Sequence, residues 1–342
     1  MIRLQVQPLD TPADVQAALQ KAIQLEFATL PPYLYALYTL RQGTNEPARA
    51  RISAIVREEM THMALAANIL NAIGGSPVLA DPSVVPSYPG PLPFDIGGDG
   101  YEPFRVSLLP FSPAAMTQAM HIEEPEDPIE FPSAELAAFP ATFQTIGQFY
   151  TALNQALVGL PPDTWAGAPR NQLSDHPFFP GELFPVTRPA DASRAIARIV
   201  SEGEGTPKTP LDFEGEVSHY YRFEEIYRDQ VLERDTSVPQ GFVWGGSLGV
   251  EWDSVIAAIA DPGEHDFTGD PAGQAAQDGC DRAFTVMLQE LQRALNGETG
   301  RLGNAVRAMF DLTMAARAAL AVPLKGGDAS AGPAFRFRPD LV

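Results

Sequence analysis

The sequence has little cysteine, little positive charge and no long apolar run. Its single cysteine, Cys280, excludes an internal disulfide framework and a thiolate metal cluster. Only 23 Lys and Arg stand against 43 Asp and Glu, and the net charge of −20 argues against nucleic acid or an anionic membrane as partner. No apolar run reaches the roughly 18 residues of a membrane span, and MIRLQVQPLDTPADVQ lacks the pattern of a signal peptide. We therefore expect a cytoplasmic protein, and leave open whether it forms a homo-oligomer.

Hydrophobic residues make up 45% of the 342 residues, which is enough for a sizeable core. Apolar residues at helical spacing predict helices at 10–30, 46–73, 140–160, 191–206, 209–233, 272–296 and 299–321. The first helix should kink or break at Pro31 and Pro32 before it continues. We predict an all-α protein. Its core covers 1–235, with Pro/Gly-rich loops inserted at 76–133 (including a short helix near 112–124) and 161–190. A C-terminal helical extension, 236–342, should pack on that core as one structural unit.

The stretch REEMTHMALAANILNAIGG, residues 57–75, places charged residues within an apolar helix. Glu59 and His62 are three residues apart, so they lie one above the other on the same helix face. Burying a charge is costly unless it is paired or bound to a metal. A solvated Glu–His pair on the helix surface is the alternative.

A second pair with the same spacing, Glu216 and His219, lies in the predicted helix 209–233. Glu26 lies in the middle of the first helix, flanked by apolar residues. Two Glu-x-x-His pairs and lone glutamates from two other helices are typical of dinuclear iron and manganese carboxylate bundles, in which carboxylates bridge the metals. The alternative is that both histidines are core residues that bond to their own glutamates.

The fourth carboxylate is less clear in the sequence. The third helix of the bundle offers Gln148 where a glutamate is expected, and an amide bridges metals poorly. Glu202 or Glu204, in SEGEG, is the substitute, and Glu204 lies between two glycines that let backbone approach a site closely. An ordinary loop that ends a helix is the alternative, and one metal position would then be weak or empty.

Two further residues are candidates for catalysis. Tyr38, or Tyr35, would lie near the metals and donate a hydrogen bond or carry a radical, although aromatics at helical spacing usually belong to the core. Arg222 follows His219 by three residues, and its planar guanidinium suits a substrate carboxylate. An ion pair of Arg222 with Glu225 or Glu26 is the alternative.

Several stretches resemble, in order, the ferritin-like family that includes the iminophenyl-pyruvate dimer synthase type of domain. They are LEFATLPPYLYALYTL, EEMTHMALAANILNAIGGSP, TIGQFYTAL, IVSEGEG and SHYYRFEEI, and the resemblance covers 15–235. Relatives occur in enzymes that couple two tryptophan-derived imines on the routes to violacein and the indolocarbazoles. The resemblance implies a ferritin-like four-helix bundle with Glu26, Glu59, His62, Glu216 and His219 as metal ligands. The family usually has a glutamate at the position of Gln148.

This resemblance implies a metal-dependent oxidase or oxygenase of secondary metabolism, with two iron ions, or manganese in their place. Its substrate would be an amino-acid-derived or aromatic small molecule, oxidised with dioxygen or peroxide, and oxidative imine coupling is one version. A manganese or iron enzyme that destroys peroxide is one alternative. A non-catalytic ferritin-like binding protein is the other.

Overall fold

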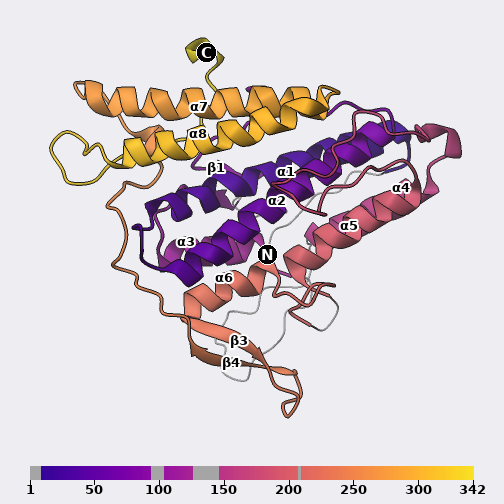
Figure 1. The fold of residues 1–342 in the computed structure, drawn as a ribbon, viewed down its shortest axis with the longest axis horizontal. Coiled ribbons are helices and arrows are strands. Elements are labelled where there is room, and N and C mark those ends of the chain that lie inside the picture. Colours follow the sequence, from indigo (N-terminus) through magenta and orange to yellow (C-terminus); the bar gives the residue numbers. More distant parts are fainter. Residues whose placement is uncertain (1–8, 94–103, 126–145, 207–208) are drawn as a thin grey trace.

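The computed structural model describes residues 9–93, 104–125, 146–206 and 209–342 (Figure 1). Within these ranges the helices are α1 (Pro12–Thr39), α2 (Glu46–Ala72), α3 (Pro113–Ile122), α4 (Ile146–Gly159), α5 (Pro189–Glu204), α6 (His219–Arg228), α7 (Pro271–Leu295) and α8 (Leu302–Leu320). Two small antiparallel pairs join β1 (Gly90–Pro91) to β2 (Arg105–Val106) and β3 (Gln230–Arg234) to β4 (Phe242–Ser247). Short 3₁₀ turns lie at Pro162–Thr164, Pro262–Glu264, Thr299–Arg301 and Pro339–Leu341.

Helix α1 begins with a capping box, in which Thr11 and Asp14 each accept from the other's backbone N–H, and Pro12 follows at the first helical position. The helix then runs through Pro31 and Pro32, so the predicted break is wrong. Pro32 has no N–H for the carbonyl four residues before it, that of Ala28. The Tyr88 hydroxyl donates to that carbonyl at 2.6 Å, and this substitute lets the buried helix continue.

The antiparallel pair α1 and α2 is the centre of the molecule (Figure 1). Helices α7 and α8 cover one side of it, where the Phe27 and Phe284 rings stack with centroids 6.1 Å apart. Helices α3 to α6 cover another side: α3 packs on α6, and α4 packs on α5. Polar side chains that α1 and α2 turn toward α3, α5 and α6 are therefore removed from water.

The predicted helices 46–73, 272–296 and 299–321 are confirmed as α2, α7 and α8, and the short helix near 112–124 is α3. Residues 94–103, 126–133 and 140–145 of the predicted segments lie outside the described residues. The prediction of one helix over 209–233 is wrong. Helix α6 ends at Arg228 and is capped by Asp229, which has a left-handed conformation (φ 54°), and β3 and β4 form a hairpin after it. No helix in the described ranges has the length and apolar character to cross a membrane.

Candidate metal centre

Two clusters of buried ligand groups lie between the helices and share one residue. Glu26, Glu59 and His62 form the first cluster, and Glu59, Glu123 and His219 form the second. In each cluster the ligand atoms all lie within 4.8 Å of one another. None of the five residues is more than 7% exposed. Glu59 therefore lies where a carboxylate can bridge two positions.

Four helices supply these side chains. Glu26 comes from the middle of α1, whereas Glu59 and His62 lie one turn apart on α2. Glu123 is the residue that caps the C-terminus of α3, and His219 is the first residue of α6. The site thus depends on the packing of α1 and α2 against α3 and α6, and only one pair in it is local in sequence.

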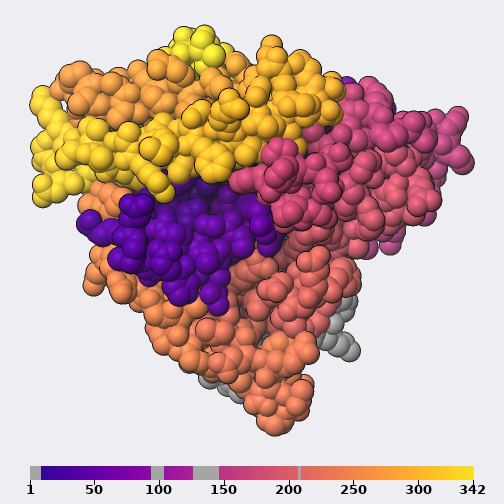
Figure 2. Space-filling model, viewed as in Figure 1, coloured from indigo at the N-terminus to yellow at the C-terminus, as the bar shows by residue number. Residues whose placement is uncertain are grey.

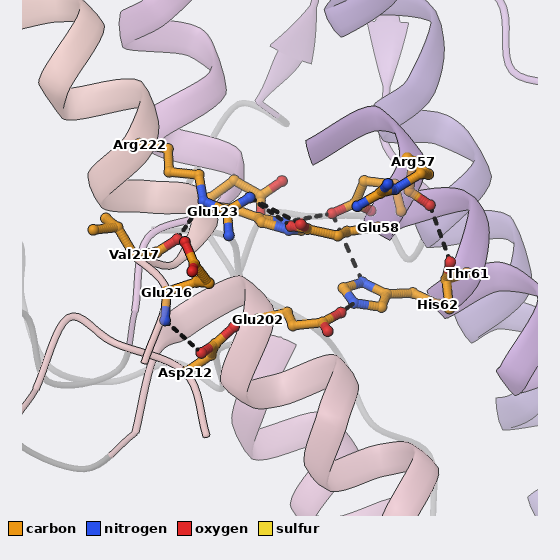
Figure 3. A network of polar contacts seen from close by, with 12 residues as sticks. Arg57, Glu58, Thr61, His62, Glu123, Glu202, Asp212, Glu216, Val217 and Arg222 are labelled. Atoms are coloured by element: carbon orange, nitrogen blue, oxygen red, sulfur yellow. Dashed lines mark hydrogen bonds and ion pairs between the residues drawn. The ribbon is translucent and has the colours of Figure 1, made fainter. Parts of the chain in front are cut away.

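Both imidazoles turn Nδ1 toward the carboxylates of the clusters. His62 Nδ1 lies 3.6 Å from Glu26 and 3.9 Å from Glu59, and His219 Nδ1 lies 2.8 Å from Glu59 and 3.6 Å from Glu123. The opposite nitrogens are held by two other acids (Figure 3). Nε2 of His62 lies 2.7 Å from Glu202, and Nε2 of His219 lies 2.9 Å from Glu58. A carboxylate that accepts from Nε2–H fixes the ring and leaves Nδ1 to act as the ligand.

Hydroxyl groups orient the three carboxylates. Thr29 donates to Glu59 at 3.0 Å, and Tyr33 donates to Glu123 at 2.5 Å. The Tyr150 hydroxyl, from α4, donates to Glu26. Each cluster carboxylate therefore has one oxygen held by the protein and further lone pairs to offer a cation.

The buried groups of the two clusters shift one another's pKa values. Burial and the nearby carboxylates of Glu123 and Glu26 raise the pKa of Glu59 to about 8, from an ordinary 4.5. Burial alone would lower the pKa of His62, but its bonds to Glu202 and Glu26 raise that pKa to about 10. The metal-free clusters are thus held together by protons that metal binding would displace.

The residues present fit a pair of divalent ions. Three carboxylates and two imidazoles match the ligand types that iron and manganese take in helical bundles. The buried Nδ1 of His219 has no partner in a hydrogen-bonding direction within the described residues, although it points into the second cluster. An unsatisfied buried nitrogen is costly, and a metal ion at that position would satisfy it.

We expect Glu59→Gln to stabilise the metal-free protein at about pH 8 but not at about pH 5. The folded-state pKa of Glu59 is raised, so the native protein binds this proton more tightly than the unfolded chain does, and its contribution is lost as pH rises from about 4.5 to about 8. At pH 5 Glu59 already carries its proton and resembles glutamine. The gain at pH 8 should be about 2–4 kcal/mol, measured as a rise in melting temperature of several degrees. Equal or lower melting temperatures at both pH values would contradict this assignment of charge, and Glu216→Gln is the exposed control.

The structure brings four of the predicted ligands together: Glu26, Glu59, His62 and His219. It does not bring Glu216 to them. The Asp212 carboxylate accepts from the backbone N–H groups of Glu214 and Glu216 and closes a tight turn, in which Glu216 is exposed. The prediction that Glu216 and His219 share a helix face is therefore wrong, because α6 begins only at His219.

The two candidates for the fourth carboxylate, Glu202 and Glu204, have different partners in the structure. Glu202 bonds to His62, whereas Glu204 accepts from the Gly147 N–H at 2.7 Å and so holds the start of α4. Gln148 is half-buried on α4. Tyr150, two residues further along α4, donates to Glu26 of the first cluster.

The two predicted catalytic residues lie in other surroundings. Tyr38 shares a hydrogen bond of 3.2 Å with Thr313 of α8 and belongs to neither cluster. Arg222 is buried and donates to both Glu58 oxygens at 2.8 and 2.9 Å, and to the Val217 carbonyl (Figure 3). The predicted ion pair of Arg222 with Glu225 or Glu26 is wrong, since Arg222 binds Glu58 and the Glu225 carboxylate is held by Arg51.

Sequence reasoning missed Glu123 and the roles of Tyr33 and Tyr150. Glu123 falls within 76–133, which the sequence marks as a loop, and the adjacent Glu124 and Glu126 make it look like part of a solvated acidic run. The signal that would have found it is the apolar face of α3, with Met116, Ala119 and Met120 buried, which leads directly to the buried Glu123.

Buried carboxylate and imidazole clusters between packed helices define a class of metal-binding helical bundles. The chain belongs to the Ferritin-like family, whose model matches residues 19–228, and this confirms both the resemblance and the predicted fold class. It is 26% identical over 271 residues to the 2-imino-3-(indol-3-yl)propanoate dimerase of Chromobacterium violaceum. That match covers 66% of this chain but 24% of the dimerase. A crystal structure of a ferritin-like protein from Caulobacter vibrioides shares the fold, with a TM-score of 0.61 and 23% identity over 97% of this chain and 100% of that one.

Proposed function

We propose that the chain is a metal-dependent oxidative enzyme that binds two ions, iron or in its place manganese. The observation that carries the proposal is the position of Glu59, which belongs to both clusters and lies between the Nδ1 atoms of His62 and His219. Glu26 and His62 would hold one ion, Glu123 and His219 the other, and Glu59 would bridge them. Bound iron supplies the redox chemistry by which such sites use dioxygen or peroxide.

The protein's own groups prepare this site. Glu58 and Glu202 keep the two imidazoles in one tautomer, and the hydroxyls of Thr29, Tyr33 and Tyr150 keep the carboxylates in place. Such outer contacts reduce the reorganisation that a changing charge at the site would otherwise require.

A cavity of about 700 Å³ favours an organic substrate over a reaction with peroxide alone. It lies between α5 and the segment 174–185, and Glu202, the partner of His62, is part of its wall. Its lining includes apolar side chains, four acidic residues and two arginines one helical turn apart, Arg194 and Arg198. The Arg194 guanidinium lies over the Phe184 ring at 3.6 Å from its centroid. A planar aromatic acid suits such a surface.

The relative's name adds a substrate class, an indole-bearing imino acid, which we propose for this chain as well. In oxidative coupling, two imine molecules form one C–C bond and release two electrons and two protons, and dioxygen or peroxide accepts them. The carboxylate of such a substrate would pair with the Arg194 guanidinium, because that of Arg198 is already paired with Glu202.

Metal content per chain, measured by elemental analysis after growth with iron and manganese, tests the site. We expect about two ions in the native protein and about one in Glu123→Gln, because that change removes a ligand of the second cluster only. The matched control is the neighbouring Glu124→Gln, which should keep two. Equal losses in both variants, or no metal in the native protein, would refute the dinuclear site and favour a non-catalytic binding protein.

Activity tests the reaction class. An amino-acid oxidase generates the imine from tryptophan and itself consumes dioxygen. Dioxygen uptake at an electrode and products by mass spectrometry are therefore compared between the oxidase alone and the oxidase with the metal-loaded protein. We expect uptake that depends on the imine and a product of twice the imine mass less two hydrogens. Rapid decomposition of peroxide without any imine would instead establish the peroxide-destroying alternative.

A further inference from the structure

A second cavity, of about 490 Å³, lies where α1 and α2 meet α7 and α8. It shares no residue with either metal cluster. Most of its wall is apolar, and the methionines Met60, Met287 and Met309 are prominent in it. Figure 2 shows α8 in yellow bordering the indigo surface of α1 and α2, three of the elements that line the cavity. Its size is typical of small-molecule sites, on the order of 300–1,000 Å³.

Polar groups gather at one side of this cavity. The hydroxyls of Tyr38 and Thr313 lie 3.2 Å apart, and the side chains of Arg49 and Arg317 belong to the lining. Arg49 is already engaged, because its guanidinium donates to the carbonyls of Leu40 and Arg41. Arg317 makes no hydrogen bond or ion pair within the described part of the chain.

The charge of this lining is opposite to that of the protein. The chain carries a net charge of −20, yet the described lining contains two arginines and no Asp or Glu. Burial raises the pKa of Tyr38 to about 12, and Tyr38 and Arg317 both line the cavity. Tyr38 therefore keeps its proton at neutral pH and remains a hydrogen-bond donor in the lining.

We propose that this cavity binds an apolar monocarboxylate, such as a medium-chain fatty acid. The carboxylate accepts hydrogen bonds from the Arg317 guanidinium and the Tyr38 hydroxyl, and the apolar body packs against the methionines. A guanidinium recognises a carboxylate by paired, charge-assisted hydrogen bonds. Flexible methionines adapt to unbranched chains, so the site should select for the acid group more strongly than for one chain shape.

This site does not depend on the proposed metal chemistry. It lies on a different face of the α1–α2 pair, and Arg317 belongs to a helix beyond the residues that the family model matches. It also gives Tyr38 a role that the clusters do not offer, because its hydroxyl points to α8.

Isothermal titration calorimetry of the full-length, metal-loaded protein with decanoate tests the proposal. We expect saturable binding, weakened about tenfold or more in Arg317→Gln and by a smaller factor in Tyr38→Phe, because each loses a donor to the carboxylate. The matched control is Arg307→Gln, an exposed arginine of the same helix outside the lining, which should bind as the native protein does. Decanol, which lacks the charge, should bind weakly and equally to all of them.

Three results would overturn the proposal: no decanoate binding to the native protein at millimolar concentration, equal losses in Arg317→Gln and Arg307→Gln, or decanol binding as tightly as decanoate. Metal content, measured on the same samples, should be equal in all variants. A failure of the dinuclear site would show there and not in the titration, so the two proposals fail separately.

Discussion

Glu59→Gln is expected to leave the protein with almost no bound metal and no oxidative activity, the largest loss that any single change in the site should cause. Glu59 is shared by the two clusters, so its replacement removes a ligand from both positions and the negative charge between them. An amide is a poor bridge because it has one oxygen donor and no charge. Glu26→Gln and Glu123→Gln each affect one cluster and should each retain about one ion.

Elemental analysis of Glu59→Gln beside Glu216→Gln measures this difference. Glu216 is exposed and lies outside both clusters, so its variant should keep about two ions and native activity. The imine-dependent uptake of dioxygen should follow the metal content. Retention of one full ion in Glu59→Gln would show that the two positions do not share this carboxylate and that the sites are separate.

The same variant separates two roles of one residue. Metal binding needs the charge of Glu59, whereas folding without metal is opposed by it, because the carboxylate is buried beside Glu26 and Glu123. A loss of metal together with a gain in metal-free stability cannot result from general misfolding. This combination is typical of sites in which stability is given up for function.

The part of the site that lies within one helix was predictable from the sequence. Glu59 and His62 are fixed by helical periodicity alone, and Glu26 is marked by apolar neighbours on both sides. The helical class of the fold followed from the same periodicity over α2, α7 and α8. Local rules were sufficient wherever the partner residues belong to one element.

The remainder depends on contacts between segments far apart in the sequence. The second Glu-x-x-His pair has the same spacing as the first, but Asp212 holds Glu216 in a turn that precedes α6. Because Glu216 is not in the helix, the spacing does not place it on the same face as His219. Glu123 replaces it from α3, across the packing of α3 on α6. The choice of Glu202 over Glu204 depends on which of two residues near the end of α5 faces α2, and periodicity could not decide it.

Pro31 and Pro32 show the same limit of prediction from local sequence. A backbone rule predicts a break, yet a tyrosine 56 residues after Pro32 supplies the hydrogen bond that the ring removes. Such compensation is visible only after the chain has folded, because the donor comes from another part of the molecule.

Arg222→Met is expected to destabilise the protein by about 3–5 kcal/mol, because it leaves a buried carboxylate without its cation. Glu58 and Arg222 are each at most 9% exposed, and the guanidinium contacts both carboxylate oxygens. Burial raises the pKa of Glu58, but the bond from His219 and the charge of Arg222 lower it to about 2, so Glu58 is ionised in the native protein. Only His219 would remain as a partner, and it is itself needed in the second cluster.

A double-mutant cycle distinguishes this ion pair from ordinary packing of the arginine stem. Glu58→Gln removes the charge that Arg222 balances, so the double variant with Arg222→Met should recover more than half of the lost stability, as measured by denaturant unfolding of the metal-free proteins. Arg188→Met is a suitable control, since Arg188 is exposed and its pair with Asp191 lies within one helix turn, where a loss of about 0.5 kcal/mol is expected. Additive losses in the double variant would mean that Arg222 acts through packing. Recovery would mean that Arg222 balances the buried charge of Glu58, the carboxylate that also contacts Nε2 of His219.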